Sequence, residues 1–135
     1  IEAGITDLGL GDVVTLKQGF MTDDQYAGMM SHADFAILFY SPVILSSSAV
    51  ALDALRFGLP SISADVPCLE ILTAGESVKV NNAEEIGQAI LSLASDEALR
   101  QKLAAAALRK SETFDCDAIA AEMESIYREL IGCAI

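Results

Sequence analysis

Short runs of strand length alternate with longer segments of helical character along this chain. Four runs predict strands, and they lie at 13–17, 35–40, 61–63 and 77–80. The run at 35–40, FAILFY, is apolar throughout, which is typical of a strand covered on both faces, as in a parallel sheet.

Helix-start signals separate and follow these runs. Thr22 with Gln25, and Asn82 with Glu85, fit the capping-box pattern. Gly58 followed by Pro60 marks a helix end. With the apolar periodicity, these signals predict helices over 22–31, 49–57, 67–73, 82–93, 95–110 and 115–130.

Strands that alternate with helices indicate right-handed crossovers between parallel strands. We therefore expect an α/β fold, a Rossmann-like parallel sheet with helices on both faces. No repeat, linker or low-complexity tract interrupts residues 1–135, which we interpret as one domain.

The charge of the chain narrows the range of ligands. The formal net charge is −12, and the eight basic residues are scattered. Such a field repels nucleic acid and anionic membrane surfaces, so we expect neither as a partner of this domain. A small phosphate ligand remains possible, because backbone N–H groups at helix starts bind anions without a positive side chain.

Metal, cofactor and membrane signals are weak. His32 is the only histidine, and we expect it to have a structural role. Cys68, Cys116 and Cys133 lie far apart, form no CxxC pair and indicate free thiols in a reducing, cytoplasmic compartment. No P-loop, GxGxxG motif, signal-peptide pattern or apolar run of ~20 residues is present. We expect no metal and no cofactor.

Ligands of open α/β sheets bind beyond the carboxyl ends of the strands, which selects the loops at 18–23, 41–48 and 64–68. The middle loop ends in three serines before the helix predicted to begin at Ala49. Their hydroxyls and the free N–H groups of that helix could bind a phosphate. The alternative, which the sequence alone favours, is that the serines only cap the helix.

Asp53 is an acidic residue on an otherwise apolar helix, AVALDALRFG. An unpaired buried carboxylate is costly, so Asp53 must find a partner or face a cleft. Two alternatives stay open at this point: an ion pair with Arg56, or hydrogen bonds from the hydroxyls of a ligand.

The order of these segments resembles the C-terminal domain of GT-B retaining glycosyltransferases of family 4 (group 1). The resemblance covers nearly the whole chain. The segments that carry it, in order, are VVTLKQGF, MMSHADFAIL, DALRFGLP at 53–60, SISAD, CLEIL and SVKVNNAEEIGQAILSL.

The resemblance implies a donor-binding site. The family has two glutamates separated by seven residues; Asp53 stands at the second, which binds ribose, and Leu45 stands at the first, which faces the donor sugar. The implied donor-binding residues are Gly19 and Phe20 near the base, Leu45, Ser46, Ser47, Ser48 and Ala49 near the sugar and diphosphate, and Asp53.

The resemblance also implies how the domain works. We interpret the start at Ile1 as a cut through a longer protein whose acceptor domain and first strands lie upstream. The expected partners are a nucleotide diphosphate sugar and that missing N-terminal domain, through which alone any membrane contact would occur. The expected activity is hexosyl transfer to a glycan or lipid, as in polysaccharide biosynthesis, with this fragment alone inactive.

Two other functions compete with sugar transfer. Because Leu45 cannot accept a hydrogen bond, the chain could be a degenerate GT-B domain that binds or supports without catalysis. A nucleotide-sugar epimerase of the same fold is a third alternative, although the segment holds few acid–base groups for one.

Overall fold

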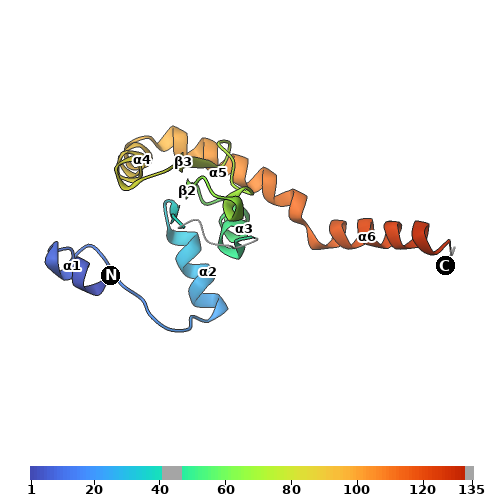
Figure 1. The fold of residues 1–135 in the computed structure, drawn as a ribbon, viewed down its shortest axis with the longest axis horizontal. Helices are drawn as coiled ribbons and strands as arrows, with labels where there is room; N and C mark the ends of the chain where they lie inside the picture. The colour runs from blue at the N-terminus through green and yellow to red at the C-terminus, as the bar shows by residue number, and fades with distance from the viewer. Residues whose placement is uncertain (41–46, 133–135) are drawn as a thin grey trace.

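A three-stranded parallel sheet lies at the centre of the fold (Figure 1). The computed structural model describes residues 1–40 and 47–132. The elements in chain order are α1 (Glu2–Asp7), α2 (Asp23–His32), β1 (Ala36–Leu38), α3 (Ala49–Arg56), β2 (Ser61–Ala64), η1 (Pro67–Leu69), β3 (Ser77–Val80), α4 (Ala83–Ser95), α5 (Glu97–Ser111), η2 (Glu112–Phe114) and α6 (Cys116–Ile131).

The strands lie in the order β1-β2-β3, so each strand pairs in parallel with the next one along the chain. In this register Ile37 lies beside Ile62, and Ile62 lies beside Val78. Successive residues of a strand point to opposite faces, so one face is rich in these branched apolar side chains. The carboxyl ends of all three strands lie at one edge of the sheet.

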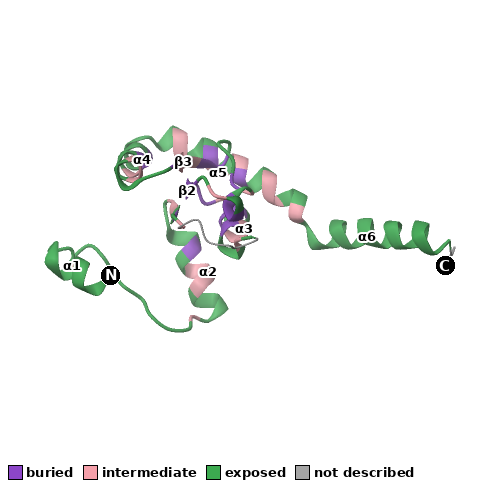
Figure 2. Ribbon diagram, in the orientation of Figure 1, coloured by how far each residue is buried: buried purple, intermediate pink, exposed green. Residues whose placement is uncertain are grey.

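Helices cover both faces, as predicted. Leu38 belongs to a buried cluster with Leu55 of α3 and Ala107 of α5. Ile62, on the opposite face, belongs to a second cluster with Leu93 of α4. Figure 2 shows the buried residues gathered over β2, α3 and α5. The predicted α/β fold class is confirmed.

The helix starts follow the predicted capping signals closely. Thr22 and Gln25 exchange both hydrogen bonds of a capping box at the start of α2. The side chain of Asn82 caps α4. The helix predicted to open at Ser95 is instead capped by Asp96.

The strand predicted at 13–17 is wrong. This segment is irregular, and the N–H of Val13 and the N–H of Val14 donate to the carbonyl oxygen of Leu10 in turns. β-Branched residues favour strands only where they pair and pack, and here the side chain of Val13 is 78% exposed. The helix α1, which precedes this segment, was not predicted.

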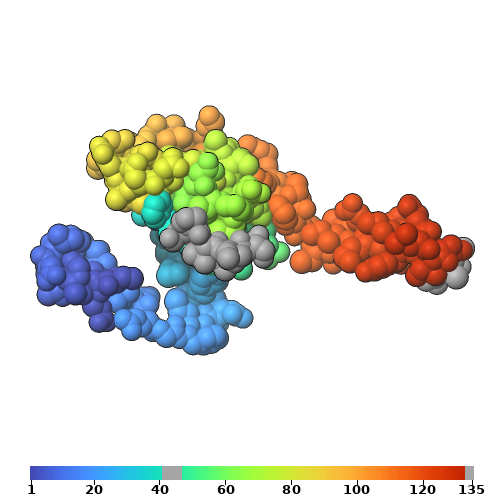
Figure 3. All heavy atoms as spheres, in the orientation of Figure 1, coloured from blue at the N-terminus to red at the C-terminus, as the bar shows by residue number. Residues whose placement is uncertain are grey.

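The two ends of the described chain extend away from the sheet. Figure 3 shows α1 on one side of the molecule and α6 projecting on the other. Neither helix contains a buried residue. Among the helices of residues 1–40 and 47–132, none has the length and apolar character needed to cross a membrane.

Candidate functional site

A hollow of about 490 Å³ lies at the carboxyl edge of the sheet, where ligands of open α/β sheets bind. It lies between the start of α3 and the segment that contains η1. Its lining combines serine hydroxyls, one carboxylate and apolar side chains, and the lining residues are Ser47, Ser48, Ala49, Leu52, Pro67, Cys68, Glu70, Ile71 and Phe114.

The start of α3 provides the polar wall of this hollow. The Oγ atom of Ser48 accepts a hydrogen bond from the N–H of Ala51, 3.3 Å away. The capping role that the sequence favoured for the serines is therefore confirmed for Ser48. Ala49 and Val50 lie just before Ala51, the residue whose N–H is capped by Ser48. No described residue accepts a hydrogen bond from the N–H group of either one.

Tyr40 adds a second hydroxyl beside this helix start. Its Oη atom lies 3.4 Å from the Oγ atom of Ser48, and either atom could be the donor. Tyr40 also packs against the buried cluster that includes Leu38 and Leu55, which fixes its ring. This packing places the Tyr40 hydroxyl beside the start of α3.

Asp53 lies one turn further along α3, and its partner comes from α2. The Oη–H of Tyr26 donates to the Oδ2 atom of Asp53 over 3.1 Å. The ion pair between Asp53 and Arg56 that we considered does not form within the described residues, where the guanidinium of Arg56 instead lies 4.0 Å from the Sγ atom of Cys116. A ligand role for Asp53 stays a prediction.

The surroundings of Tyr26 keep its hydroxyl protonated. Burial raises the pKa of Tyr26 above 10.0, and the hydrogen bond to Asp53 and the charges of Asp53 and Tyr40 raise it further. A phenol with a raised pKa is a hydrogen-bond donor throughout the neutral range. The hydroxyl of Tyr26 therefore donates to Asp53 throughout the neutral pH range.

The structure brings some of the predicted donor-binding residues together. Ser47, Ser48 and Ala49 line the hollow, and Asp53 follows on the same helix. Leu45 and Ser46 lie outside the described residues. The predicted residues Ser48, Ala49 and Asp53 therefore all belong to α3 or to its N-cap.

The two residues predicted to border the base lie elsewhere. Gly19 and Phe20 belong to the irregular segment between α1 and α2, and neither lines the hollow. The side chain of Phe20 is 94% exposed, and Gly19 has a φ of 96°, in the region that favours glycine. Their role stays a prediction.

The sequence reasoning missed Tyr26, Tyr40 and Glu70. Tyr40 closes the apolar run FAILFY, and its place at the carboxyl end of a strand could have identified it. Glu70 directly follows η1 and lines the hollow, so the ligand-binding loop extends beyond the predicted range of 64–68. No local signal marks Tyr26, because its partner lies on another helix.

The described residues hold no group of three or more His, Cys, Asp or Glu side chains that could bind a metal ion. Cys68 lines the hollow as a free, buried thiol, and Cys116 is a free, exposed thiol. The polar groups that line the hollow are serine hydroxyls, the carboxylate of Glu70, the thiol of Cys68 and backbone N–H groups.

The fold of this chain is also found in part of a solved structure. The chain is similar to part of sucrose-phosphate synthase (tll1590) from Thermosynechococcus elongatus, with a TM-score of 0.75 and 24% sequence identity over 98% of this chain. The two share a fold. The match covers 34% of the synthase, so this chain spans about a third of its length. No protein-family model matches the chain, and no curated protein matches its sequence.

Proposed function

We propose that this chain is the donor-binding domain of a glycosyltransferase that moves a sugar from a nucleotide diphosphate sugar to a glycan or lipid acceptor. The observation that carries the proposal is one helix, α3, which opens onto the hollow at the carboxyl edge of the sheet and bears Asp53 one turn later. The fold shared with part of a protein named sucrose-phosphate synthase supports it.

The start of α3 suits the diphosphate of such a donor. The first N–H groups of a helix have no partner within the helix, and the helix dipole places roughly half a positive charge there. In our proposal the N–H groups of Ala49 and Val50 and the hydroxyl of Ser48 bind the diphosphate. Donors held in this way also stabilise the charge that develops on a leaving diphosphate.

Asp53 suits the ribose of the donor. It lies ~6 Å further along the helix axis than Ala49, since a helix rises about 1.5 Å per residue. A carboxylate only accepts hydrogen bonds, so Asp53 selects a hydroxyl donor and repels a phosphate. The proposal places the base near Gly19 and Phe20 and the donor sugar near Leu45.

Sugar transfer in this proposal takes place against a second, acceptor-binding domain of the same protein. The domain alone would bind the donor but would not turn it over. The reaction would take place in the cytoplasm, where the free thiols of Cys68 and Cys116 are stable.

A binding domain without catalysis is the second candidate. It is favoured by Leu45, which has no hydrogen-bonding group at the position where the resemblance implies a glutamate. The net charge of −12 also opposes the approach of a diphosphate. In this case the domain binds a nucleotide or a partner, and no sugar is transferred.

Thermal unfolding of the full-length protein with UDP, GDP, ADP and their sugars tests the proposal. A ligand at about 100 times its dissociation constant stabilises the folded state by ~2.7 kcal/mol. We expect one nucleotide to raise the melting temperature, Asp53→Ala to abolish the rise, and Asp117→Ala on the exposed α6 to leave it intact. If no nucleotide shifts the transition of the wild type, the proposal fails. Nucleotide binding without release of a transferred sugar favours the second candidate.

A further inference from the structure

Tyr26 connects two helices that the sequence gives no reason to connect. Its ring packs against a buried cluster that contains Met30 of its own helix and Ala54 of α3. Its hydroxyl reaches the Oδ2 atom of Asp53 over 3.1 Å. The ring is thus held by apolar packing while the hydroxyl is directed at the carboxylate.

We propose that Tyr26 is a positioning residue, which fixes the carboxylate of Asp53 so that it selects a ligand by its hydroxyl groups. This inference rests on the proposed function, in which Asp53 binds the ribose, and it adds the residue that orients the carboxylate towards the ribose hydroxyls. It concerns the ribose of the nucleotide and not its base or its phosphates.

The geometry gives Tyr26 this role because an aspartate on a helix surface can adopt several rotamers. A hydrogen bond to Oδ2 from a ring that packs against Met30 and Ala54 selects one of them. The Oδ1 atom then remains to accept a hydrogen bond from outside the protein. Without the phenol, part of the binding free energy would be lost in ordering the carboxylate.

The direction of the hydrogen bond also defines the ligand. The hydroxyl of Tyr26 donates to Asp53, and a carboxylate oxygen acts only as an acceptor. A ligand group at Oδ1 must therefore carry a hydrogen, as a hydroxyl does. The pKa of Tyr26, raised by burial and by Asp53, keeps this arrangement in the neutral range.

The test uses the full-length protein and three variants: Tyr26→Phe, Asp53→Asn and, as a matched control, Tyr127→Phe. Tyr127 lies on α6 with 55% of its surface exposed, so its variant removes the same hydroxyl away from the site. Calorimetric titration with UDP, GDP and ADP first identifies the nucleotide that binds. The 2′-deoxy and 3′-deoxy analogues of that nucleotide are then titrated into each variant.

We expect Tyr26→Phe to weaken binding of the ribonucleotide roughly tenfold, the usual effect of one hydrogen bond to a charged group. We also expect the preference for the ribonucleotide over its deoxy analogues to fall towards one in Tyr26→Phe and in Asp53→Asn. Tyr127→Phe should keep both the affinity and the preference of the wild type.

Each other outcome overturns the inference in a distinguishable way. Tyr26→Phe could keep the wild-type preference for the ribonucleotide over its deoxy analogues while Asp53→Asn loses it. That result overturns the role of Tyr26 and leaves the proposed function standing. Equal weakening for every analogue shows that the phenol only supports the fold, which also overturns it. If no nucleotide binds the wild type, the proposed function fails, and the inference fails with it.

Discussion

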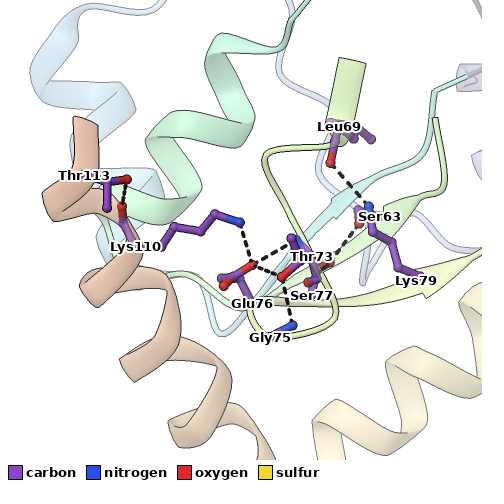
Figure 4. A network of polar contacts seen from close by, with 9 residues as sticks. All are labelled: Ser63, Leu69, Thr73, Gly75, Glu76, Ser77, Lys79, Lys110 and Thr113. Carbon is purple, nitrogen blue, oxygen red and sulfur yellow. Dashed lines mark hydrogen bonds and ion pairs between the residues drawn. The ribbon is translucent and has the colours of Figure 1, made fainter. Parts of the chain in front are cut away.

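The ammonium group of Lys110, near the end of α5, lies 3.1 Å from the Oε2 atom of Glu76, directly before β3 (Figure 4). The N–H and the hydroxyl of Thr73 donate to the same oxygen. The hydroxyl of Ser77 in turn donates to the carbonyl oxygen of Thr73. These contacts hold the segment between β2 and β3, which supplies Glu70 and its neighbours to the hollow, against the sheet and α5.

Glu76→Ala should destabilise the protein by about 2–3 kcal/mol, because it leaves Lys110 and Thr73 without their shared acceptor. The side chain of Glu76 is only 11% exposed, so water replaces the lost contacts poorly. Urea unfolding of the wild type and the variant measures the difference.

The matched control is Glu124→Ala, which removes the exposed ion pair with Arg128 on α6. Exposed pairs of this kind contribute little to stability, so its unfolding midpoint should equal that of the wild type. Equal losses in the two variants would contradict the role of Glu76 described above.

The contribution of Glu76 should depend on pH. Burial raises the pKa of this carboxyl, but the hydrogen bonds from Thr73 and Lys110 outweigh burial and lower the pKa below 4.5. A carboxyl with a lowered pKa in the folded state contributes its full stabilisation above the unfolded value of 4.5 and loses it as the pH falls through the folded value.

Comparison of the wild type with Glu76→Gln from pH 7 to pH 3 checks this sign. The difference in the free energy of unfolding should be constant at neutral pH and should narrow below pH 4.5. A difference that stays constant over the whole range would show that ionisation of Glu76 does not stabilise the fold.

Gly58→Ala should destabilise the protein by about 1–3 kcal/mol, from backbone strain and overpacking together. Gly58 ends α3 with a φ of 60°, and a Cβ atom there would lie 2.8 Å from the Cγ atom of Leu108 on α5. Thermal unfolding of the variant measures the loss.

Gly87→Ala is the control for Gly58. Gly87 lies within α4, and a Cβ atom there meets nothing within 4 Å. The substitution should stabilise the protein by up to about 1 kcal/mol, since alanine favours helices over glycine. If both variants change stability in the same direction, the close contact with Leu108 does not determine the effect at Gly58.

Two substitutions at Ser48 separate helix capping from ligand binding. Ser48→Ala removes the cap of α3 and should cost about 1 kcal/mol in the free energy of unfolding. Ser48→Asp keeps a capping oxygen and should retain wild-type stability. Its negative charge should nevertheless abolish nucleotide binding, because it lies where the diphosphate is proposed to bind.

Urea unfolding and calorimetric titration of both variants distinguish the two effects. A stable Ser48→Asp variant that still binds the nucleotide would exclude the start of α3 as the diphosphate site. In that case the nucleotide would have to bind elsewhere on the protein.

Local signals in the sequence were enough to predict most helices. Thr22 and Gln25 are close in sequence and form their reciprocal bonds in the structure. The strand at 13–17 could not be judged in this way, because a strand depends on a neighbour that is distant in sequence. Val13 has the residue type of a strand but no such neighbour within the described residues.

The same distinction applies to the candidate site. Ser48 could be identified because a cap and a strand end are visible in a few consecutive residues, and Asp53 because an acid stands out on an apolar helix. Tyr26 could not, since it lies 27 residues before its partner on a different helix. Contacts between elements are fixed by packing, which no single segment specifies.

The order of the strands has a consequence for how the protein folds. β1 pairs with β2, and β2 pairs with β3, so each strand meets the strand that comes next in the chain. Pairing of this kind closes only moderate loops, whose entropic cost grows slowly with length. Each strand pairs with the one made just before it, so the three strands can pair in the order in which they are synthesised.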